Sequence, residues 1–205
     1  MHGDSLPPDH QAAPDAATSS AIQLFSQQQL EPEQVHQLYK GFPLSLLASL
    51  VIATILSASQ WKVIAHADII RWNLLLISVL LLRIVLWLCW KNVHQLYSSR
   101  FWLNSFRLGA WLTGIAWGTA ALLLFAAEET IYQALLAFTL AGVATGSITS
   151  LTVDKYSSIG FVIFTISPLS IVMLLQDGPT AMAMSGMSFI FIFLYWLVPN
   201  ARAAP

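Results

Sequence analysis

One arginine lies deep in the most apolar stretch of the chain, where a permanent charge is costly. Residues 74–90 read LLLISVLLLRIVLWLCW, and Arg83 is the charged residue among them. Such a side chain either extends toward the lipid headgroups or lies inside a helix bundle, where it marks a functional site. Inside a bundle it would need carbonyls freed at Pro168 or the hydroxyls of Thr145 and Thr149, because the apolar stretches contain no carboxylate. Arg83 is therefore the first candidate for binding a ligand or a signal, with extension to the headgroups as the alternative.

Small residues recur every four positions in two other apolar stretches. Gly114 and Gly118 lie in the first, and Gly142 and Gly146 lie in the second. Helices in lipid associate through close backbone contact at small residues, so each series predicts a packing seam. Packing within one bundle, a homodimer seam and a ligand crevice beside the glycines all fit this pattern.

Pro168 lies in the middle of the apolar stretch SIGFVIFTISPLSIVMLL. A proline inside a helix removes one backbone hydrogen bond and bends the helix. Nearby hydroxyls can satisfy the freed carbonyl. Pro168 therefore predicts a kink, which is either static or a signalling hinge.

Three methionines lie close together near the end of the last apolar stretch: Met182, Met184 and Met187. Thioethers bind soft ions such as Cu(I). Their spacing does not place all three on one helix face, and methionine also fills irregular packing gaps. We therefore predict no metal site and no cofactor, with these methionines as the weak exception.

The composition is that of a membrane protein. Of the 205 residues, 57% are hydrophobic and 9% are charged, and the formal net charge is −1. This charge balance, with its scattered Lys and Arg residues, excludes a nucleic-acid-binding surface. The lipid bilayer is the expected partner.

Six apolar runs are each about long enough to cross a bilayer as a helix. They lie near 42–60, 69–90, 108–127, 131–152, 157–176 and 180–198. We expect an all-α, polytopic bundle of six transmembrane helices over residues 34–199. Residues 1–33 are polar and rich in proline and predict a disordered cytoplasmic leader, and residues 200–205 a short tail.

The expected orientation follows from the basic residues, which concentrate in cytoplasmic loops of membrane proteins. With a cytoplasmic N-terminus, the inner segments carry most of the Lys and Arg residues, against only Lys62 and Arg71 outside. The connection KNVHQLYSSRFWLNSFR is predicted to lie along the inner leaflet. Both termini are therefore expected in the cytoplasm.

Catalytic chemistry has little support in this sequence. An intramembrane serine protease needs a histidine within the bundle, and all five histidines lie outside the apolar runs. Paired histidines at the helical spacing of a metalloprotease do not occur. We expect a chain that is not itself an enzyme.

The succession LYKGFPLSLLASL, FWLNSFRLGAWLTGIAWGTAALLLF and ALLAFTLAGVATGSITSLTVDKYSSIGFVIFTISPLSIVMLL resembles a known bacterial region. It is similar to the N-terminal six-span input region of membrane-bound GGDEF-type diguanylate cyclases and of some sensor histidine kinases. The similarity covers roughly residues 36–198 and includes the stretch from Trp111 to Gly118.

This resemblance implies a sensory module of the bacterial inner membrane, usually dimeric, that signals to a cytoplasmic output domain. The output would be a diguanylate cyclase, which makes cyclic di-GMP, or a kinase. The chain ends at VPNARAAP without such a domain, so we expect either an input domain or a partner subunit. A small-molecule carrier, or an accessory subunit of a membrane complex, is the alternative function.

Replacing Gly142 and Gly146 with Leu tests the homodimer seam. If close approach at these glycines joins two copies, the bulkier side chains should abolish a crosslinked dimer in membranes. The measurement is the dimer yield after crosslinking, and an unchanged yield would remove this role from the two glycines.

Overall fold

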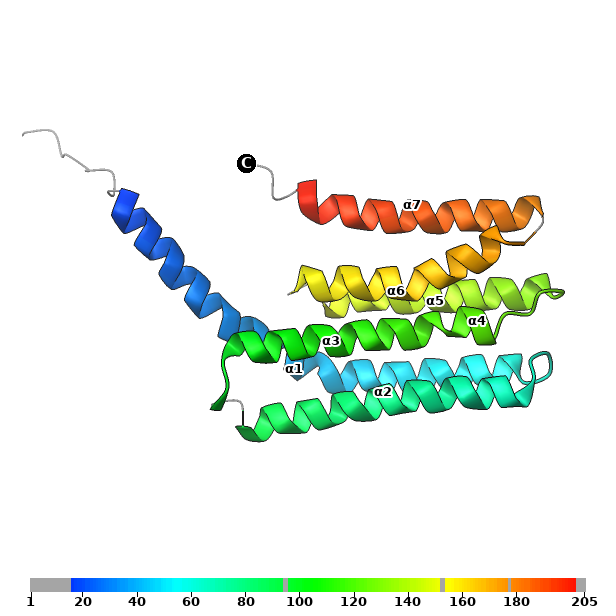
Figure 1. The fold of residues 1–205 in the computed structure, drawn as a ribbon, viewed down its shortest axis with the longest axis horizontal. Coiled ribbons are helices and arrows are strands. Elements are labelled where there is room, and N and C mark those ends of the chain that lie inside the picture. The colour runs from blue at the N-terminus through cyan, green and yellow to red at the C-terminus, as the bar shows by residue number, and fades with distance from the viewer. Residues whose placement is uncertain (1–15, 94–95, 152–153, 177, 202–205) are drawn as a thin grey trace, which may run out of the picture.

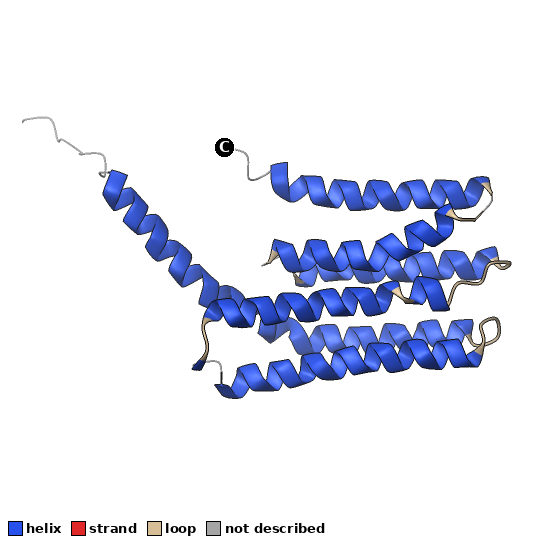
Figure 2. Cartoon of the chain, viewed as in Figure 1, coloured by secondary structure: helices blue, strands red, loops and turns tan. Residues whose placement is uncertain are grey.

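All regular secondary structure in the described residues is helical. The computed structural model describes residues 16–93, 96–151, 154–176 and 178–201. Figure 1 shows the helices in order, and Figure 2 shows helices and loops, without a strand, among the described residues. The helices are α1 Ala16–Gln60, α2 His66–Val93, α3 Ser99–Gly118, α4 Ala120–Leu123, α5 Thr130–Ser150, α6 Lys155–Leu174 and α7 Pro179–Ala201. The predicted all-α class is confirmed.

Four segments are long and apolar enough to cross a membrane. They are His36–Gln60, His66–Val93, Thr130–Ile148 and Lys155–Leu174, and Ala181–Tyr195 within α7 is a shorter apolar segment. Large hydrophobic side chains are exposed along these helices, for example Leu44, Leu74 and Phe138 at 74%, 60% and 78%. Such surfaces suit lipid and not water.

The first helix is longer than the sequence predicts. The expected disordered leader covers residues 1–33, but α1 begins at Ala16, so residues 16–33 are helical. Residues 1–15 lie outside the described residues. Figure 1 shows this first part of α1 leaning away from the other helices. Helix α1 thus has one part inside the bundle and another part that extends out of it.

The third apolar run is shifted along the chain relative to its helix. The sequence predicts a span over 108–127, but α3 begins at Ser99 and ends at Gly118. Ser98 accepts a hydrogen bond from the Phe101 backbone N–H, which caps the helix start earlier than hydropathy indicates. At the other end, the Thr119 hydroxyl donates to the Ala116 carbonyl, a local bond that competes with helix continuation. The connection that the sequence predicts along the inner leaflet is therefore shorter than expected.

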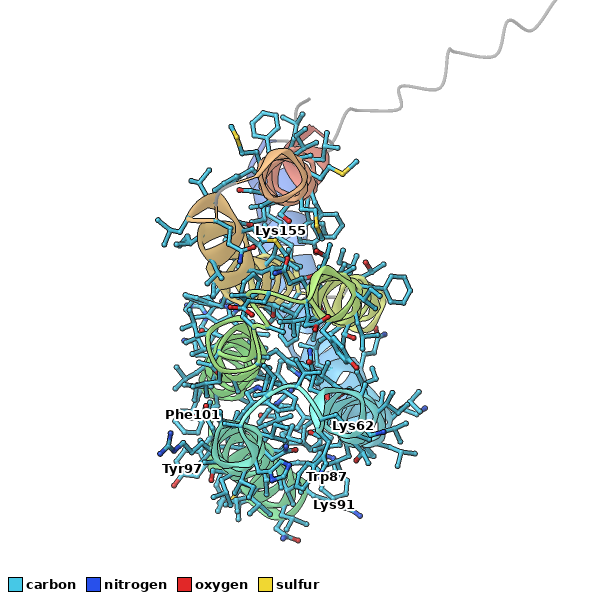
Figure 3. The ribbon with its side chains drawn as sticks, turned by 90° about the vertical axis from the view of Figure 1, so that its right-hand side faces the viewer. Lys62, Trp87, Lys91, Tyr97, Phe101 and Lys155 are labelled. Atoms are coloured by element: carbon cyan, nitrogen blue, oxygen red, sulfur yellow. The ribbon has the colours of Figure 1, made fainter. Side chains whose placement is uncertain are left out.

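The helices run alternately up and down, with their connections at opposite ends. The turns after α1, α4 and α6 lie at one end, and those after α2 and α5 lie at the other (Figure 1). Viewed along the helices, Lys62 marks the turn after α1, whereas α7 forms the opposite edge of the bundle (Figure 3). Helix α3 packs against α1, α2 and α6, and α7 packs against α6.

Helices α3 and α6 approach each other closely at two of the predicted glycines. A Cβ atom at Gly114 would lie 2.8 Å from the Phe161 carbonyl oxygen, and one at Gly118 would overlap the Phe164 carbonyl oxygen. Pro168 lacks the N–H that would bond the Phe164 carbonyl in a regular helix. The proline and Gly118 therefore belong to one contact. In it, the Phe164 carbonyl, which lacks an N–H partner at Pro168, faces a residue without a side chain.

An ion pair fixes the other end of the same two helices. Arg107 in α3 donates to both carboxylate oxygens of Asp154, at 2.7 and 2.9 Å. Asp154 also caps α6, where it accepts hydrogen bonds from the Ser157 backbone N–H and hydroxyl. Burial alone would raise the pKa of Asp154, but the hydrogen bonds from Arg107 and Ser157 outweigh it and lower the pKa.

Replacing Asp154 with Asn should destabilise the fold at pH 7. Arg107 would keep its charge in a partly buried site without a carboxylate, at a cost of about 3 kcal/mol in the free energy of unfolding. The loss should be complete above the ordinary Asp pKa of about 3.9 and shrink as the pH falls through the lowered pKa of Asp154. Thermal unfolding in detergent from pH 3 to pH 8 measures it.

The exposed pair of Asp68 and Arg71 provides the matched control. Its side chains are 32% and 71% exposed, so Asp68→Asn should change stability by less than about 1 kcal/mol. If Asp154→Asn shifted unfolding no more than Asp68→Asn, the ion pair would not hold α3 to α6.

Replacing Gly118 with Ala should weaken the contact between α3 and α6. The added methyl group has no room beside the Phe164 carbonyl and Pro168, so the free energy of unfolding should fall by about 1–3 kcal/mol. Gly186→Ala in α7 is the control, because a Cβ there would meet no atom within 4 Å. Equal unfolding temperatures for the two variants in detergent would contradict the close approach.

Candidate functional site

Arg83 lies between helices and does not extend along the lipid-facing surface. Its guanidinium carbon lies 4.8 Å from the centre of the Phe42 ring and 5.3 Å from that of Phe106. One guanidinium nitrogen donates to the Thr113 hydroxyl at 3.3 Å. The residue thus joins α1, α2 and α3. The expected alternative, extension toward the headgroups, is not what the structure shows.

The bundle leaves space for the arginine at Gly109 in α3. A Cβ atom at this position would lie 3.3 Å from Cγ and 3.5 Å from Nε of Arg83. Thr113, one turn further along α3, donates its own hydrogen to the Gly109 carbonyl at 2.8 Å. Its hydroxyl oxygen is thereby oriented to accept from Arg83. Gly109 therefore leaves room for the aliphatic part of the Arg83 side chain, and Thr113 accepts a hydrogen bond from its guanidinium group.

The position of α1 beside Arg83 depends on a proline in its own sequence. Pro43 lies within α1 and has no N–H to bond the Tyr39 carbonyl four residues earlier. The indole N–H of Trp87 in α2 donates to that carbonyl at 3.2 Å. Tyr39 also stacks on Trp90 with ring centres 4.7 Å apart. These contacts fix α1 against α2 within one turn of Phe42.

Arg83 lines a partly open cavity of about 140 Å³. Helix α1 contributes most of one wall, α5 contributes the facing wall, and Phe106, Thr113 and Phe161 complete the lining. The lining residues of α1 are Leu38, Gly41, Phe42, Ser45, Ala48, Ser49 and Ile52. Those of α5 and its C-cap are Gly142, Val143, Gly146, Ser147 and Leu151. The cavity is therefore mostly apolar, with a few hydroxyls and one guanidinium.

The four predicted seam glycines separate into two groups. Gly114 and Gly118 make the close contact with α6, whereas a Cβ at Gly142 or Gly146 would meet no atom within 4 Å. The second pair instead lines the cavity beside Arg83. Of the three readings of the glycine pattern, packing applies to α3, and a crevice is present beside α5. The homodimer seam stays a prediction.

The other predicted partners of Arg83 lie elsewhere. Thr145 is exposed and donates to the Ala141 carbonyl of its own helix at 2.8 Å. The side chain of Thr149 lies outside the described residues. Pro168 lies at the contact of α3 and α6 with Gly118. The structure thus places Arg83 beside the Thr113 hydroxyl and not beside the predicted hydroxyl of Thr145.

The three methionines do not form a common cluster around one point. Met184 and Met187 line an open groove between α5, α6 and α7, and Met182 is not among its lining residues. Met182 and Met187 are 65% and 72% exposed. Among the described residues, no group of three His, Cys, Asp or Glu side chains is arranged to hold a metal ion. The weak methionine hypothesis gains no support from this arrangement.

Sequence reasoning misses the aromatic and glycine residues that surround Arg83. Phe42 and Phe106 come from different helices and lie far apart in the chain, so no local pattern pairs them. One local signal exists: Gly109 and Thr113 are four residues apart, which places both on one face of α3. A small residue and a hydroxyl at this spacing suit an incoming polar side chain.

Known proteins provide no further identification of this site. Comparisons with protein-family models, with curated proteins and with solved structures find no match to the chain.

Proposed function

We propose that this chain is a non-catalytic sensory or regulatory module with six membrane spans, located in the bacterial inner membrane. In this proposal it relays a signal from the membrane or envelope to a cytoplasmic diguanylate cyclase or histidine kinase. The resemblance of residues 36–198 to such input regions suggests the output. The environment of Arg83 suggests where the signal is received.

The observation that carries the proposal is that one helix both lines the Arg83 cavity and leaves the bundle. Phe42 of α1 packs on the guanidinium, and further α1 residues form one cavity wall. The same helix continues back to Ala16, away from the other helices (Figure 1). A shift of α1 at the cavity would therefore move the segment outside the bundle. A continuous helix is a physical connection between two such places.

The charge distribution supports cytoplasmic termini. Lys91, Arg100 and Lys155 lie at the end of the bundle from which the first part of α1 extends, whereas Asp68 and Glu129 lie at the other end (Figure 1). Basic residues concentrate on the cytoplasmic side of membrane proteins. In the proposed orientation the extension of α1 therefore faces the compartment that would contain the output domain.

The residues between α2 and α3, and those in the first turn of α3, support the same orientation. Leu96, Tyr97 and Phe101 are 77%, 56% and 49% exposed, and Arg100 is exposed beside them. Tyr97 and Phe101 stack with ring centres 5.1 Å apart, and Figure 3 shows both at the outside of the bundle. Exposed aromatic residues next to basic ones suit a headgroup region with anionic lipids.

Replacing Arg83 with Leu should change the signal output without removing the protein from the membrane. The change removes the charge that joins α1, α2 and α3, so the balance between signalling states should shift about fivefold or more. The measurements are the cellular cyclic di-GMP concentration and the phosphorylated fraction of response regulators. Arg83→Lys should give a smaller change, because it retains the charge at Thr113 but not the planar group between the rings.

Arg71→Leu is the matched control, since Arg71 lies in the same helix but is exposed near its other end. It should leave both outputs unchanged. Membrane abundance of each variant, measured by immunoblot, separates lost signalling from lost protein. If deletion of the whole chain changed neither output, the sensory proposal would be wrong. Altered solute uptake in that strain would instead favour the carrier.

A further inference from the structure

We propose that the cavity beside Arg83 binds a single-chain amphiphilic carboxylate, such as a long-chain fatty acid. The carboxylate would lie on the guanidinium, and the acyl chain would leave between α1 and α5. This inference deepens the proposed function, because it names the chemical class that the sensory site would receive. It rests on the geometry of the cavity and on the bonding state of Arg83.

Most hydrogen-bond donors of the guanidinium remain available to a ligand. Phe42 and Phe106 lie with their ring centres 4.8 and 5.3 Å from the guanidinium carbon, within the range of a cation–π contact. The N–H groups of arginine lie in the plane of the group and match a carboxylate in a paired, parallel arrangement. Among the described residues, the Thr113 hydroxyl is the one hydrogen-bond acceptor of these donors. The remaining donors fit a planar anion.

No carboxylate of the described residues neutralises Arg83. Its contacts are two phenyl rings and one hydroxyl, whereas the buried carboxylate of Asp154 is paired with Arg107. A cation away from water is stabilised most strongly by an anion with which it forms hydrogen bonds. An anionic ligand therefore has a larger energetic advantage at Arg83 than a neutral one of the same shape.

The size of the cavity favours a small anionic head. Its volume of about 140 Å³ is close to that of a cavity of about 150 Å³ that binds benzene. A carboxylate and a few methylene groups have a similar number of heavy atoms. A phosphate with a glycerol backbone has more. The residues around the head are mostly apolar, with hydroxyls at Ser45, Ser49 and Ser147.

The path for the acyl chain lies between two helices with small side chains. On the α5 side, a Cβ at Gly142 would meet no atom within 4 Å, so this wall of the cavity is open. On the α1 side, Gly41 and Ala48 line the same space and are exposed. A methylene chain can therefore lie along the crevice and continue into the surrounding lipid.

The depth of Arg83 also suits a single-chain ligand. Helix α2 covers residues 66–93, so in a bilayer centred on this helix Arg83 would lie roughly 5 Å from the bilayer centre. A phospholipid phosphate lies at the headgroup level, about 15 Å from the centre of a bilayer with a hydrocarbon core of about 30 Å. A fatty acid has no second chain or glycerol to hold its carboxylate at that level.

Binding of tritiated palmitate to the purified full chain in detergent tests the proposal. Scintillation proximity should show saturable binding, and Arg83→Leu should weaken it about tenfold or more, because the paired charged hydrogen bonds are lost. Arg83→Lys should bind with intermediate affinity. Hexadecanol, which has the same chain but no charge, should compete about tenfold less well than unlabelled palmitate.

Two further variants keep the test independent of folding. Gly142→Leu retains Arg83 but fills the crevice, so it should also weaken palmitate binding. Arg71→Leu should bind like the natural chain, because Arg71 is exposed near the other end of α2. Size-exclusion profiles and unfolding temperatures establish that each variant is folded.

Several results would overturn the inference. One is the absence of saturable palmitate binding. Another is that the folded Arg83→Leu and Gly142→Leu variants bind palmitate as strongly as the natural chain. Stronger competition by phosphatidylglycerol than by palmitate, or equal competition by inorganic phosphate, would also reject a single-chain carboxylate. Binding is measured without any output domain. If the chain bound palmitate but Arg83→Leu did not change signalling, only the sensory function would be rejected. If Arg83→Leu changed signalling but the chain did not bind palmitate, only this ligand class would be rejected.

Discussion

The arrangement of the first three helices depends on the cost of keeping one guanidinium away from water. A buried cation is strongly destabilising unless surrounding groups replace its hydration. Here α1 and α3 each place a phenyl ring near Arg83, and α3 adds the Thr113 hydroxyl. The two rings and the hydroxyl can contact Arg83 only if α1 and α3 are correctly positioned relative to α2. The Arg83 charge therefore specifies how the three helices are placed. Nonspecific contacts between apolar side chains in lipid would specify it less, since lipid tails offer similar contacts.

The second constraint is the backbone carbonyl that each helix proline leaves without its N–H partner. In an apolar environment such a carbonyl requires another partner or close protection. The chain uses two different solutions. At Pro43, the Trp87 indole donates to the Tyr39 carbonyl and thereby joins α2 to α1. At Pro168, the Phe164 carbonyl faces Gly118, where the lack of a side chain lets α3 approach closely. Both prolines therefore become contacts between helices.

The sequence predicts the helices well because their signal is local. Each of the six apolar runs falls on a long helix, although the third is shifted and the first begins earlier. Hydropathy does not report the cap at Ser98, and it does not show that residues 16–33 are helical. The site is predicted less well. Arg83 is identifiable as a charge in an apolar run, but Phe42, Phe106 and Thr113 become its neighbours only through the packing of three helices.

The position of α1 connects these constraints to the proposed signalling function. Its contact with α2 at Tyr39 and its contact with Arg83 at Phe42 lie within one helical turn. The cavity wall follows immediately along the same helix, and the segment outside the bundle precedes it. An anion on Arg83 would compete for the charge that the Phe42 ring now helps to stabilise, while its chain would push between α1 and α5. Both effects act on α1, whereas α3 is held to α6 by the Gly118 contact and by Arg107 with Asp154. Under the proposed function, the anion therefore displaces α1 against its contacts with α2, and the pair of α3 and α6 is the frame against which it moves.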